Sequence, residues 1–157
     1  MLLSEILQQA VEPAYQLLPA KMESQGATVL LLAIGLQESR FTHRRQIGGP
    51  ARGFWQFERA GGVAGVLRHP STRLQAVTVC DERDVPVVAE QVYQRLEFDD
   101  VLAAAFARLL LFTDPAPLPK VGECGKAWDY YLRTWRPGRP HRKTWDTLYA
   151  QALEALV

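Results

Sequence analysis

The chain has 157 residues, of which 48% are hydrophobic and 22% charged; this excludes a disordered protein and predicts a single domain over residues 1–157. The formal net charge of +1 argues against a dedicated nucleic-acid binder, although a local basic patch is compatible with it. The longest apolar run, 29–36, is far shorter than the roughly 20 residues that cross a bilayer, and segment 1–15 lacks the basic start of a signal peptide. We therefore expect a soluble protein that is made in the cytoplasm and has no membrane span.

Apolar periodicity, capping residues and turn signals predict helices along most of the chain. In chain order they are expected at residues 2–18, 27–40, 63–68, 72–79, 85–96, 101–112, 122–134 and 142–156. The expected N-caps are Ser4, Ser71, Asp84 and either Asp99 or Asp100, and Pro13 is expected to kink or break the first helix.

Helix 101–112 is apolar nearly all round, which predicts that it is the buried centre of the fold. Residues 42–57 contain too many Gly, Pro and Arg residues for a helix, so we expect an ordered loop there. Strand signals are nearly absent elsewhere. The predicted fold class is therefore all-α, with at most a small β-hairpin in that loop.

The cysteines and histidines do not form a recognisable metal site. Cys80 and Cys124 lie far apart and belong to no CxxC pair, so two buried thiols are expected, with a disulfide or a metal role as the alternatives. His43, His69 and His141 do not combine with each other or with a cysteine at metal-ligand spacing. No glycine-rich phosphate loop is present, so we expect neither a metal nor another cofactor.

Glu38 lies near the end of the apolar helix 27–40. At helical spacing it shares a stripe with Leu31 and Ile34, and apolar neighbours raise the pKa of a carboxyl group. The negative end of the helix dipole acts in the same direction. A carboxyl group that stays protonated near neutral pH suits a general acid acting on sugars. The alternative is that Glu38 simply forms an ion pair with Arg40, Arg44 or Arg45.

Two short motifs carry a resemblance to a known family. Residues 38–41 read Glu-Ser-Arg-Phe, and residues 50–56 read Pro-Ala-Arg-Gly-Phe-Trp-Gln. They resemble the Glu-Ser-x-Phe and Gly-Ala-x-Gly-Leu-Met-Gln elements of lytic transglycosylases of the soluble type and their phage relatives, with the spacing from Glu38 to Gln56 kept. The resemblance covers about a fifth of the chain and implies a lysozyme-like fold.

The resemblance also implies roles for the motif residues. Glu38 would be the catalytic acid and base, Ser39 would support the structure beside it, and Gln56 would line the sugar cleft and hydrogen-bond to substrate. Phe54 and Trp55 replace Leu and Met of the family and would add aromatic faces to the cleft, since such faces pack against pyranose rings. Core filling is the alternative for Trp55.

The chain departs from the family at several positions. Pro50 replaces the first Gly of the second element, and Arg45 and Ile47 replace Ala and Ser. The family's later Ala-Tyr-Asn element is missing, because residues 105–107 read Ala-Phe-Ala. Tyr131 or Tyr130 is the remaining candidate to face Glu38 and the substrate, with ordinary packing as the alternative.

The family mechanism needs one carboxylate, whereas a hydrolysing lysozyme normally needs a second. Glu58, just after the second motif, is the candidate partner at the cleft edge. Its alternative role is a solvated salt bridge with Arg59 or Arg52. Asp81, Glu82 and Asp84 are less well placed. We favour the single-carboxylate mechanism, which yields a 1,6-anhydro-muramic product, over lysozyme-type hydrolysis.

Residues 130–145 interleave arginines and a lysine with Trp135 and Trp145. Such a segment can bind nucleic acid or polyanionic components of the cell wall or outer membrane, or it can be a solvated loop whose tryptophans pack inward. Part of it is also a candidate to close one wall of the cleft. No helix-turn-helix or zinc-finger pattern accompanies it, so no nucleic acid is expected.

The expected function is therefore cleavage of the MurNAc-GlcNAc linkage in peptidoglycan glycan strands. The resemblance to phage proteins suggests a virion-associated or prophage-encoded enzyme, with virion components as further partners, that reaches the cell wall by phage delivery or at lysis. The competing expectation, raised by the altered second motif, is a degenerate domain that binds glycan or builds a phage structure without catalysis.

Overall fold

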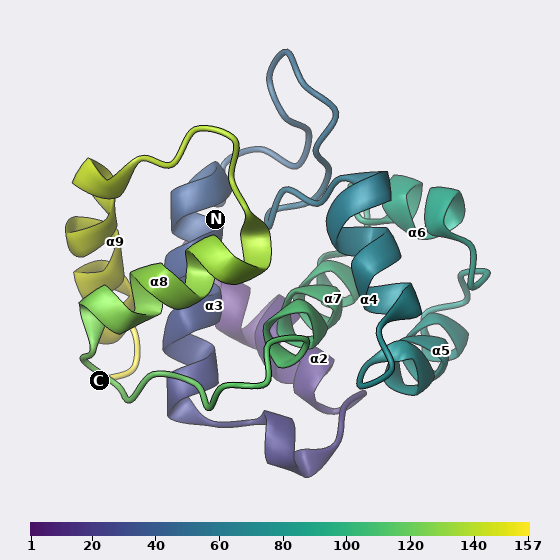
Figure 1. The fold of residues 1–157 in the computed structure, drawn as a ribbon, viewed down its shortest axis with the longest axis horizontal. Coiled ribbons are helices and arrows are strands. Elements are labelled where there is room, and N and C mark those ends of the chain that lie inside the picture. Colours follow the sequence, from purple (N-terminus) through teal and green to yellow (C-terminus); the bar gives the residue numbers. More distant parts are fainter.

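The computed structural model describes residues 1–157 and is built from helices alone (Figure 1), which confirms the all-α prediction. Two isolated bridges, Arg45 with Arg52 and Arg52 with Phe57, are what remains of the expected hairpin. The helical segments in chain order are α1 Leu3–Ile6, η1 Leu7–Val11, α2 Glu12–Tyr15, η2 Ala20–Met22, α3 Gln25–Ser39, η3 Arg59–Val63, α4 Ala64–Arg68, α5 Arg73–Glu82, α6 Ala89–Arg95, α7 Asp100–Phe112, α8 Cys124–Trp135 and α9 Arg142–Glu154.

Helix α7 is the centre of the fold, as its uniformly apolar sequence predicts. Every residue from 102 to 111 is buried, and helices α2, α3, α4, α5 and α8 all pack against α7. The Asp99 side chain caps its start by accepting a hydrogen bond from the Leu102 N–H at 3.0 Å, as predicted. Figure 1 shows α3, α8 and α9 on one side of α7, and α4, α5 and α6 on the other.

The N-terminal helix continues through Pro13 instead of breaking there. A wider π-turn, η1, ends at Val11, two residues before the proline, and the Glu12 N–H donates to the Leu7 carbonyl five residues back. Pro13 has no N–H to donate to the carbonyl four residues back. The π-turn accommodates this missing hydrogen bond, so the helix remains continuous. The predicted cap Ser4 is wrong, because the helix begins at Leu3 and the Leu2 N–H is bound by the Glu5 carboxylate at 2.8 Å.

Two further predicted N-caps are also wrong. Ser71 is occupied with His69, since its N–H and Oγ both lie against His69 Nδ1 at 3.1 and 2.7 Å, and α5 begins only at Arg73. Asp84 ends α5 instead of starting α6: it adopts a left-handed φ of 53°, and the following Val85 N–H donates to the Cys80 carbonyl at 3.0 Å. This is the hydrogen-bond pattern of a helix C-terminus.

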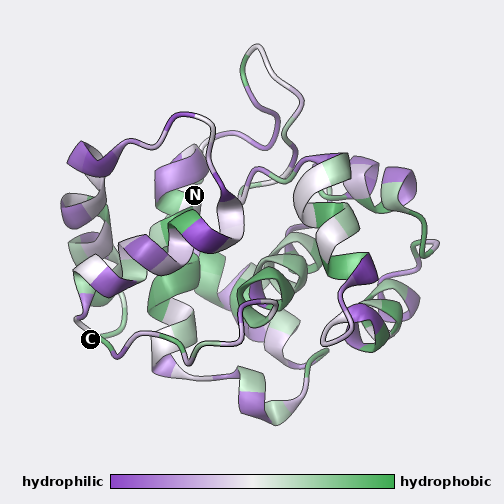
Figure 2. Cartoon of the chain, in the orientation of Figure 1, coloured by the Kyte–Doolittle hydropathy of each residue, from purple (hydrophilic) through white to green (hydrophobic).

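Nearly all buried hydrophobic residues form one core cluster that includes much of α3 and most of α7. Figure 2 shows hydrophobic residues concentrated in these inner helices, while hydrophilic residues are frequent along the outer ones. No helix combines the length and apolar character that crossing a membrane requires. Both cysteines are free thiols. Cys80 is buried as expected, whereas Cys124 is partly exposed, with its Sγ 3.1 Å from Asp146 Oδ1.

Candidate active site

The end of helix α3 places Glu38 at the rim of the core. The helix starts at the Ser24 cap and runs buried from Ala27 to Leu36. It ends because the next two residues, Arg40 and Phe41, both adopt left-handed φ angles of 56° and 53°. Such backbone angles are costly outside glycine and are found preferentially at functional sites.

A close approach between Gly35 and Phe41 lets the chain fold back over this last turn. The Phe41 ring lies so near Gly35 that a Cβ there would be 2.0 Å from its Cζ atom. Phe41 is itself buried and meets the rings of Phe54 and Trp55 edge-on, each at a centroid distance of 5.5 Å. The first motif is thereby packed directly onto the second.

Ser39 joins the two motifs by hydrogen bonds. Its buried Oγ donates to the Phe54 carbonyl at 2.7 Å and accepts from the Phe41 N–H at 3.1 Å. The neighbouring Glu38 is thus held between a helix and a loop whose positions are fixed relative to each other. This supporting position agrees with the one that the sequence predicts for Ser39. The sequence also predicts that Ser39 helps to shape the sugar cleft and bind substrate, and this is wrong because the residue is only 1% exposed.

Phe54 and Trp55 do not face solvent. Trp55 is completely buried and donates from Nε1 to the Leu31 carbonyl at 2.8 Å, and Phe54 is 1% exposed. The prediction that these two rings line a sugar cleft is therefore wrong, because they fill the core beneath the motif. The accessible aromatic residue is Trp135 on α8, whose Nε1 donates to the Trp55 carbonyl at 2.9 Å.

Glu38 makes no ion pair. The three arginines that were its candidate partners are engaged elsewhere: Arg40 with the Leu36 and Gln37 carbonyls, Arg44 with Asp100, and Arg45 with Glu97. Its single side-chain hydrogen bond comes from the Tyr131 hydroxyl, which donates to Oε1 at 3.2 Å. The alternative of a simple surface ion pair is therefore excluded.

The surroundings raise the pKa of Glu38 to about 7. Burial, which disfavours the charged carboxylate, is the main cause. The hydrogen bond from Tyr131 acts in the opposite direction, and the negative charge of Glu58 adds to the increase. A carboxyl group with this pKa is present in both protonated and ionised forms near neutral pH, so it can both give and take a proton.

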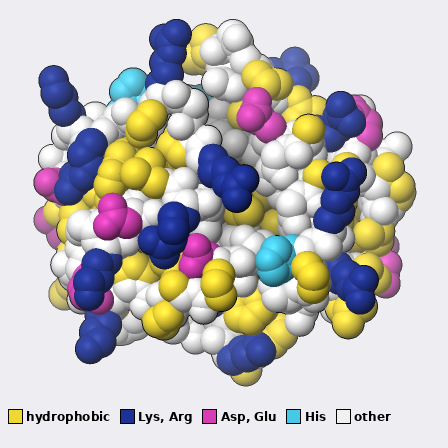
Figure 3. Space-filling model, viewed as in Figure 1, with side chains coloured by type: hydrophobic (Ala, Val, Ile, Leu, Met, Phe, Trp, Pro, Cys, Tyr) yellow, Lys and Arg dark blue, Asp and Glu magenta, His cyan; other side chains and the backbone are white.

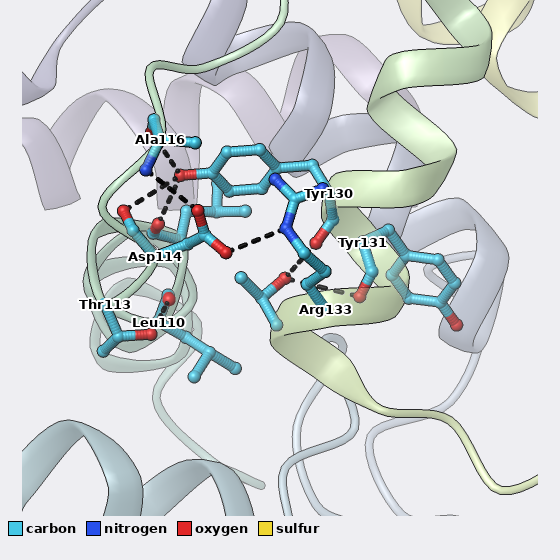
Figure 4. A network of polar contacts seen from close by, with 9 residues as sticks. Leu110, Thr113, Asp114, Ala116, Tyr130, Tyr131 and Arg133 are labelled. Carbon is cyan, nitrogen blue, oxygen red and sulfur yellow. Dashed lines mark hydrogen bonds and ion pairs between the residues drawn. The ribbon is translucent and has the colours of Figure 1, made fainter.

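Tyr131 is one of the two tyrosines predicted to face Glu38, and the structure selects it over Tyr130. It is 2% exposed, and its ring stacks on Trp145 at a centroid distance of 5.3 Å and an interplanar angle of 9°. Tyr130 points the opposite way, toward the end of α7, where its hydroxyl lies 2.9 Å from the Leu111 carbonyl (Figure 4). The tyrosine that contacts Glu38 therefore comes from helix α8.

A groove of about 470 Å³ lies between η3 and α4 on one side and the end of α8 on the other. Its walls include Gln56, Glu58 and Trp135, whereas Glu38 and Tyr131 are not part of its lining. Glu38 is partly exposed, and Tyr131 connects it to the groove wall: the Tyr131 hydroxyl donates to Glu38, and the Tyr131 ring lies 6.3 Å from that of Trp135. Figure 3 shows this face of the molecule with a hollow near its middle and basic side chains around it.

Gln56 and Glu58 lie at the edge of this groove, where the sequence predicts them. Gln56 has a left-handed φ of 53°, and its Nε2 donates to the Gly53 carbonyl at 2.9 Å, which leaves its side-chain oxygen free. Glu58 is exposed and forms no ion pair, because Arg59 pairs with Glu90 and Arg52 donates to the Pro50 carbonyl. The salt bridge considered as the alternative role of Glu58 is absent.

Some residues of the basic aromatic segment 130–145 pack inside the protein, and others line the groove. Arg133 pairs with Asp114 and Arg142 with Asp146, and Trp145 is completely buried. Trp135 reaches the groove wall. The sequence makes this segment a candidate for a cleft wall without singling out Trp135. The signal for that residue is its spacing of four residues from Tyr131, which puts both on one face of a helix.

Comparisons with protein-family models, with curated proteins and with solved structures find no match to this chain. The function must therefore be argued from the two motifs and from the geometry around Glu38.

Proposed function

We propose that this protein cleaves the glycan strands of peptidoglycan at the MurNAc-GlcNAc linkage as a lytic transglycosylase. The observation that carries the proposal is the setting of Glu38, a partly exposed carboxyl group that forms no ion pair and accepts a hydrogen bond from Tyr131. Burial raises its pKa to about 7, and Tyr131 connects it to the wall of the groove through Trp135. A lysozyme-like arrangement of the helices and an association with a phage particle or prophage belong to the same proposal.

In this mechanism Glu38 acts twice. Its protonated form first gives a proton to the glycosidic oxygen, so that the bond between that oxygen and C1 of the muramic acid breaks. The 6-hydroxyl oxygen of the same muramic acid then bonds to C1, and the Glu38 carboxylate takes the hydroxyl proton. The product is a 1,6-anhydro sugar, and Glu38 returns to its starting state without a second carboxylate or a water molecule.

Lysozyme-type hydrolysis of the same bond is the second candidate, because Glu58 is exposed, free of ion pairs and part of the groove wall. Its charge also contributes to the raised pKa of Glu38. In a hydrolase Glu58 would act as nucleophile or as the base for a water molecule. The chemistry of the released sugar end distinguishes the two candidates.

The decisive experiment is digestion of purified peptidoglycan by wild type, Glu38→Gln and Glu58→Gln, with mass spectrometry of the released muropeptides. We expect anhydro products from wild type and Glu58→Gln, and a loss of at least about a thousandfold in rate for Glu38→Gln. Reducing ends that disappear in Glu58→Gln would instead establish a hydrolase. A wild type that releases nothing from the walls of several bacteria would favour a non-catalytic glycan-binding or structural protein.

Tyr131→Phe is expected to move the pH profile of the reaction toward alkaline values. The lost hydrogen bond lowers the pKa of Glu38 in the wild type, so its removal raises that pKa above about 7. The first step needs protonated Glu38, so kcat/KM falls as pH rises through this pKa. A hydrogen bond of about 1 kcal/mol corresponds to a shift of the falling limb by roughly 0.7 pH unit.

Tyr130→Phe is the matched control, because the Tyr130 hydroxyl contacts backbone carbonyls and not Glu38. Its falling limb should coincide with that of the wild type. A Tyr131→Phe profile that shifts toward acid would contradict the assignment of Glu38 as the acid that Tyr131 adjusts.

A further inference from the structure

A second cavity, of about 520 Å³, adjoins the groove on the far side of His69 and Thr113, which line both. It lies between η2, the turn that follows α4 and the proline-rich connector that follows α7. None of the residues assigned to the proposed reaction lines it.

The wall of this cavity contains a buried arginine without a counter-ion. Arg108, near the end of α7, is 5% exposed, and its Nε donates to the Met22 carbonyl at 2.8 Å. Its Nη1 is buried and has no hydrogen-bond partner, and no carboxylate lies within ion-pair distance. An unpaired buried charge is strongly unfavourable, and burial lowers the pKa of Arg108 accordingly.

The other two charged residues that line the cavity, Lys21 and Asp114, do not neutralise the charge of Arg108. Lys21 stands at its edge without an ion pair, with its Nζ 5.2 Å from the centre of the Phe112 ring. The one carboxylate in the lining, Asp114, is already bound by Arg133 Nε and by the Ala116 N–H, both at 2.9 Å (Figure 4). No carboxylate of the protein forms an ion pair with Arg108 or Lys21.

Two neutral side chains add hydrogen-bond donors. His69 Nδ1 accepts from the Ser71 N–H at 3.1 Å, so the ring carries its hydrogen on Nε2. Ser24 Oγ accepts from the Ala27 N–H at 3.0 Å, and its own hydrogen stays free for another acceptor. Both residues line the same cavity.

We propose that this cavity binds an oxyanion, held by Arg108 and Lys21. Because the cavity and the groove share His69 and Thr113 as wall residues, the oxyanion would be a carboxylate of the peptide attached to the glycan strand. This source of the oxyanion rests on the proposed function. The groove would hold the sugars and the cavity a peptide carboxylate, so the protein would favour peptide-bearing strands over bare ones. Binding of the oxyanion itself does not depend on catalysis.

The first test measures thermal unfolding in sodium acetate and in sodium phosphate against sodium chloride of equal ionic strength. The wild type is expected to gain stability in a saturating manner with acetate or phosphate beyond the chloride reference. Lys21→Gln should need about tenfold more anion, while Lys143→Gln, which removes an equally exposed lysine outside both cavities, should respond like wild type.

Arg108→Met provides an independent result. Without added anion it should be at least as stable as the wild type, because an apolar side chain replaces an uncompensated charge, and it should lose the response to acetate and phosphate. The proposal is overturned if the wild type responds no more to either anion than to chloride, or if Lys21→Gln responds like wild type.

The second test identifies the source of the oxyanion with glycan strands that retain or lack their peptides. The binding protein is Glu38→Gln, which holds strands without cleaving them. Adding Lys21→Gln should weaken binding of peptide-bearing strands about tenfold and leave binding of bare strands unchanged. Equal binding of both strands by Glu38→Gln would overturn the peptide assignment, whereas an inactive wild type that still binds acetate would refute the proposed function and leave the oxyanion site standing.

Discussion

Glu38→Gln is expected to raise the free energy of unfolding by about 3 kcal/mol at pH 8 while it abolishes the proposed glycan cleavage. The folded protein holds the pKa of Glu38 at about 7, whereas the ordinary value is 4.5. Each unit of difference corresponds to about 1.4 kcal/mol, and ionisation of Glu38 is therefore easier in the unfolded chain. A neutral glutamine removes this penalty and can still accept the hydrogen bond from Tyr131.

Because Glu38 ionises more easily in the unfolded chain, the stability difference between wild type and Glu38→Gln depends on pH. Below about pH 4.5 Glu38 is protonated in both states, so wild type and variant should be equally stable. Between about pH 4.5 and 7 the wild type loses stability relative to the variant, and above about pH 7 the difference stays constant. Urea unfolding at pH 4 and pH 8 measures the difference at both extremes. The control is Glu82→Gln at the exposed end of α5, which forms no ion pair and should change stability by less than about 0.5 kcal/mol.

A Glu38→Gln variant that is less stable than the wild type at pH 8 would contradict the assignment of a buried carboxyl group with a raised pKa. Such a result would mean that ionised Glu38 makes favourable contacts in the fold.

Gly35→Ala is expected to destabilise the protein by about 3 kcal/mol or more and to abolish activity. Its Cβ would lie 2.0 Å from Cζ and 2.4 Å from Cε1 of Phe41, and that ring is held on its other sides by Phe54 and Trp55. Overpacking of a dense core costs about 1–3 kcal/mol and sometimes more, which outweighs the gain of about 1 kcal/mol from alanine in a helix. The displaced ring would also shift the turn that carries Glu38.

The matched control is Gly125→Ala in the first turn of α8, where a Cβ would meet nothing within 4 Å. We expect this variant to be more stable than the wild type by about 0.5–1 kcal/mol with unchanged activity. Thermal unfolding and muropeptide release measure both effects. If Gly35→Ala unfolds at the wild-type temperature, the packing of Phe41 on α3 is not what holds this turn.

The strongest sequence patterns predict the fold best. The apolar stretches that become α3 and α7 are confirmed with their boundaries within two residues, because their burial and the Asp99 cap act in the same direction. The predicted caps at Ser71 and Asp84 are wrong because both residues make other contacts. The Ser71 side chain binds the His69 ring, and Asp84 belongs to the turn that ends α5. A single-residue capping signal does not say which of two adjacent helices it serves.

The candidate site shows the same limit at longer range. Glu38 and Ser39 lie where local spacing puts them, and Tyr131 meets Glu38 across 93 residues of sequence. Trp55 is buried instead of lining the cleft, and Trp135 reaches the groove wall, because an aromatic residue in a motif does not reveal which side of the loop faces the core. Packing against α3 and α8 determines which side of the loop faces the core, and a local sequence pattern carries no information about that packing.

One face of helix α8 carries both a residue of the groove wall and the residue that donates a hydrogen bond to Glu38. Tyr131 and Trp135 are one turn apart on α8, and Trp135 is tied to the Trp55 carbonyl while Tyr131 is tied to Glu38. A ligand that moves this face therefore changes the proton affinity of Glu38, and by reciprocity the protonation of Glu38 changes the affinity for that ligand. Proton uptake and groove occupancy are then linked quantities, and the number of protons taken up on binding measures their coupling directly.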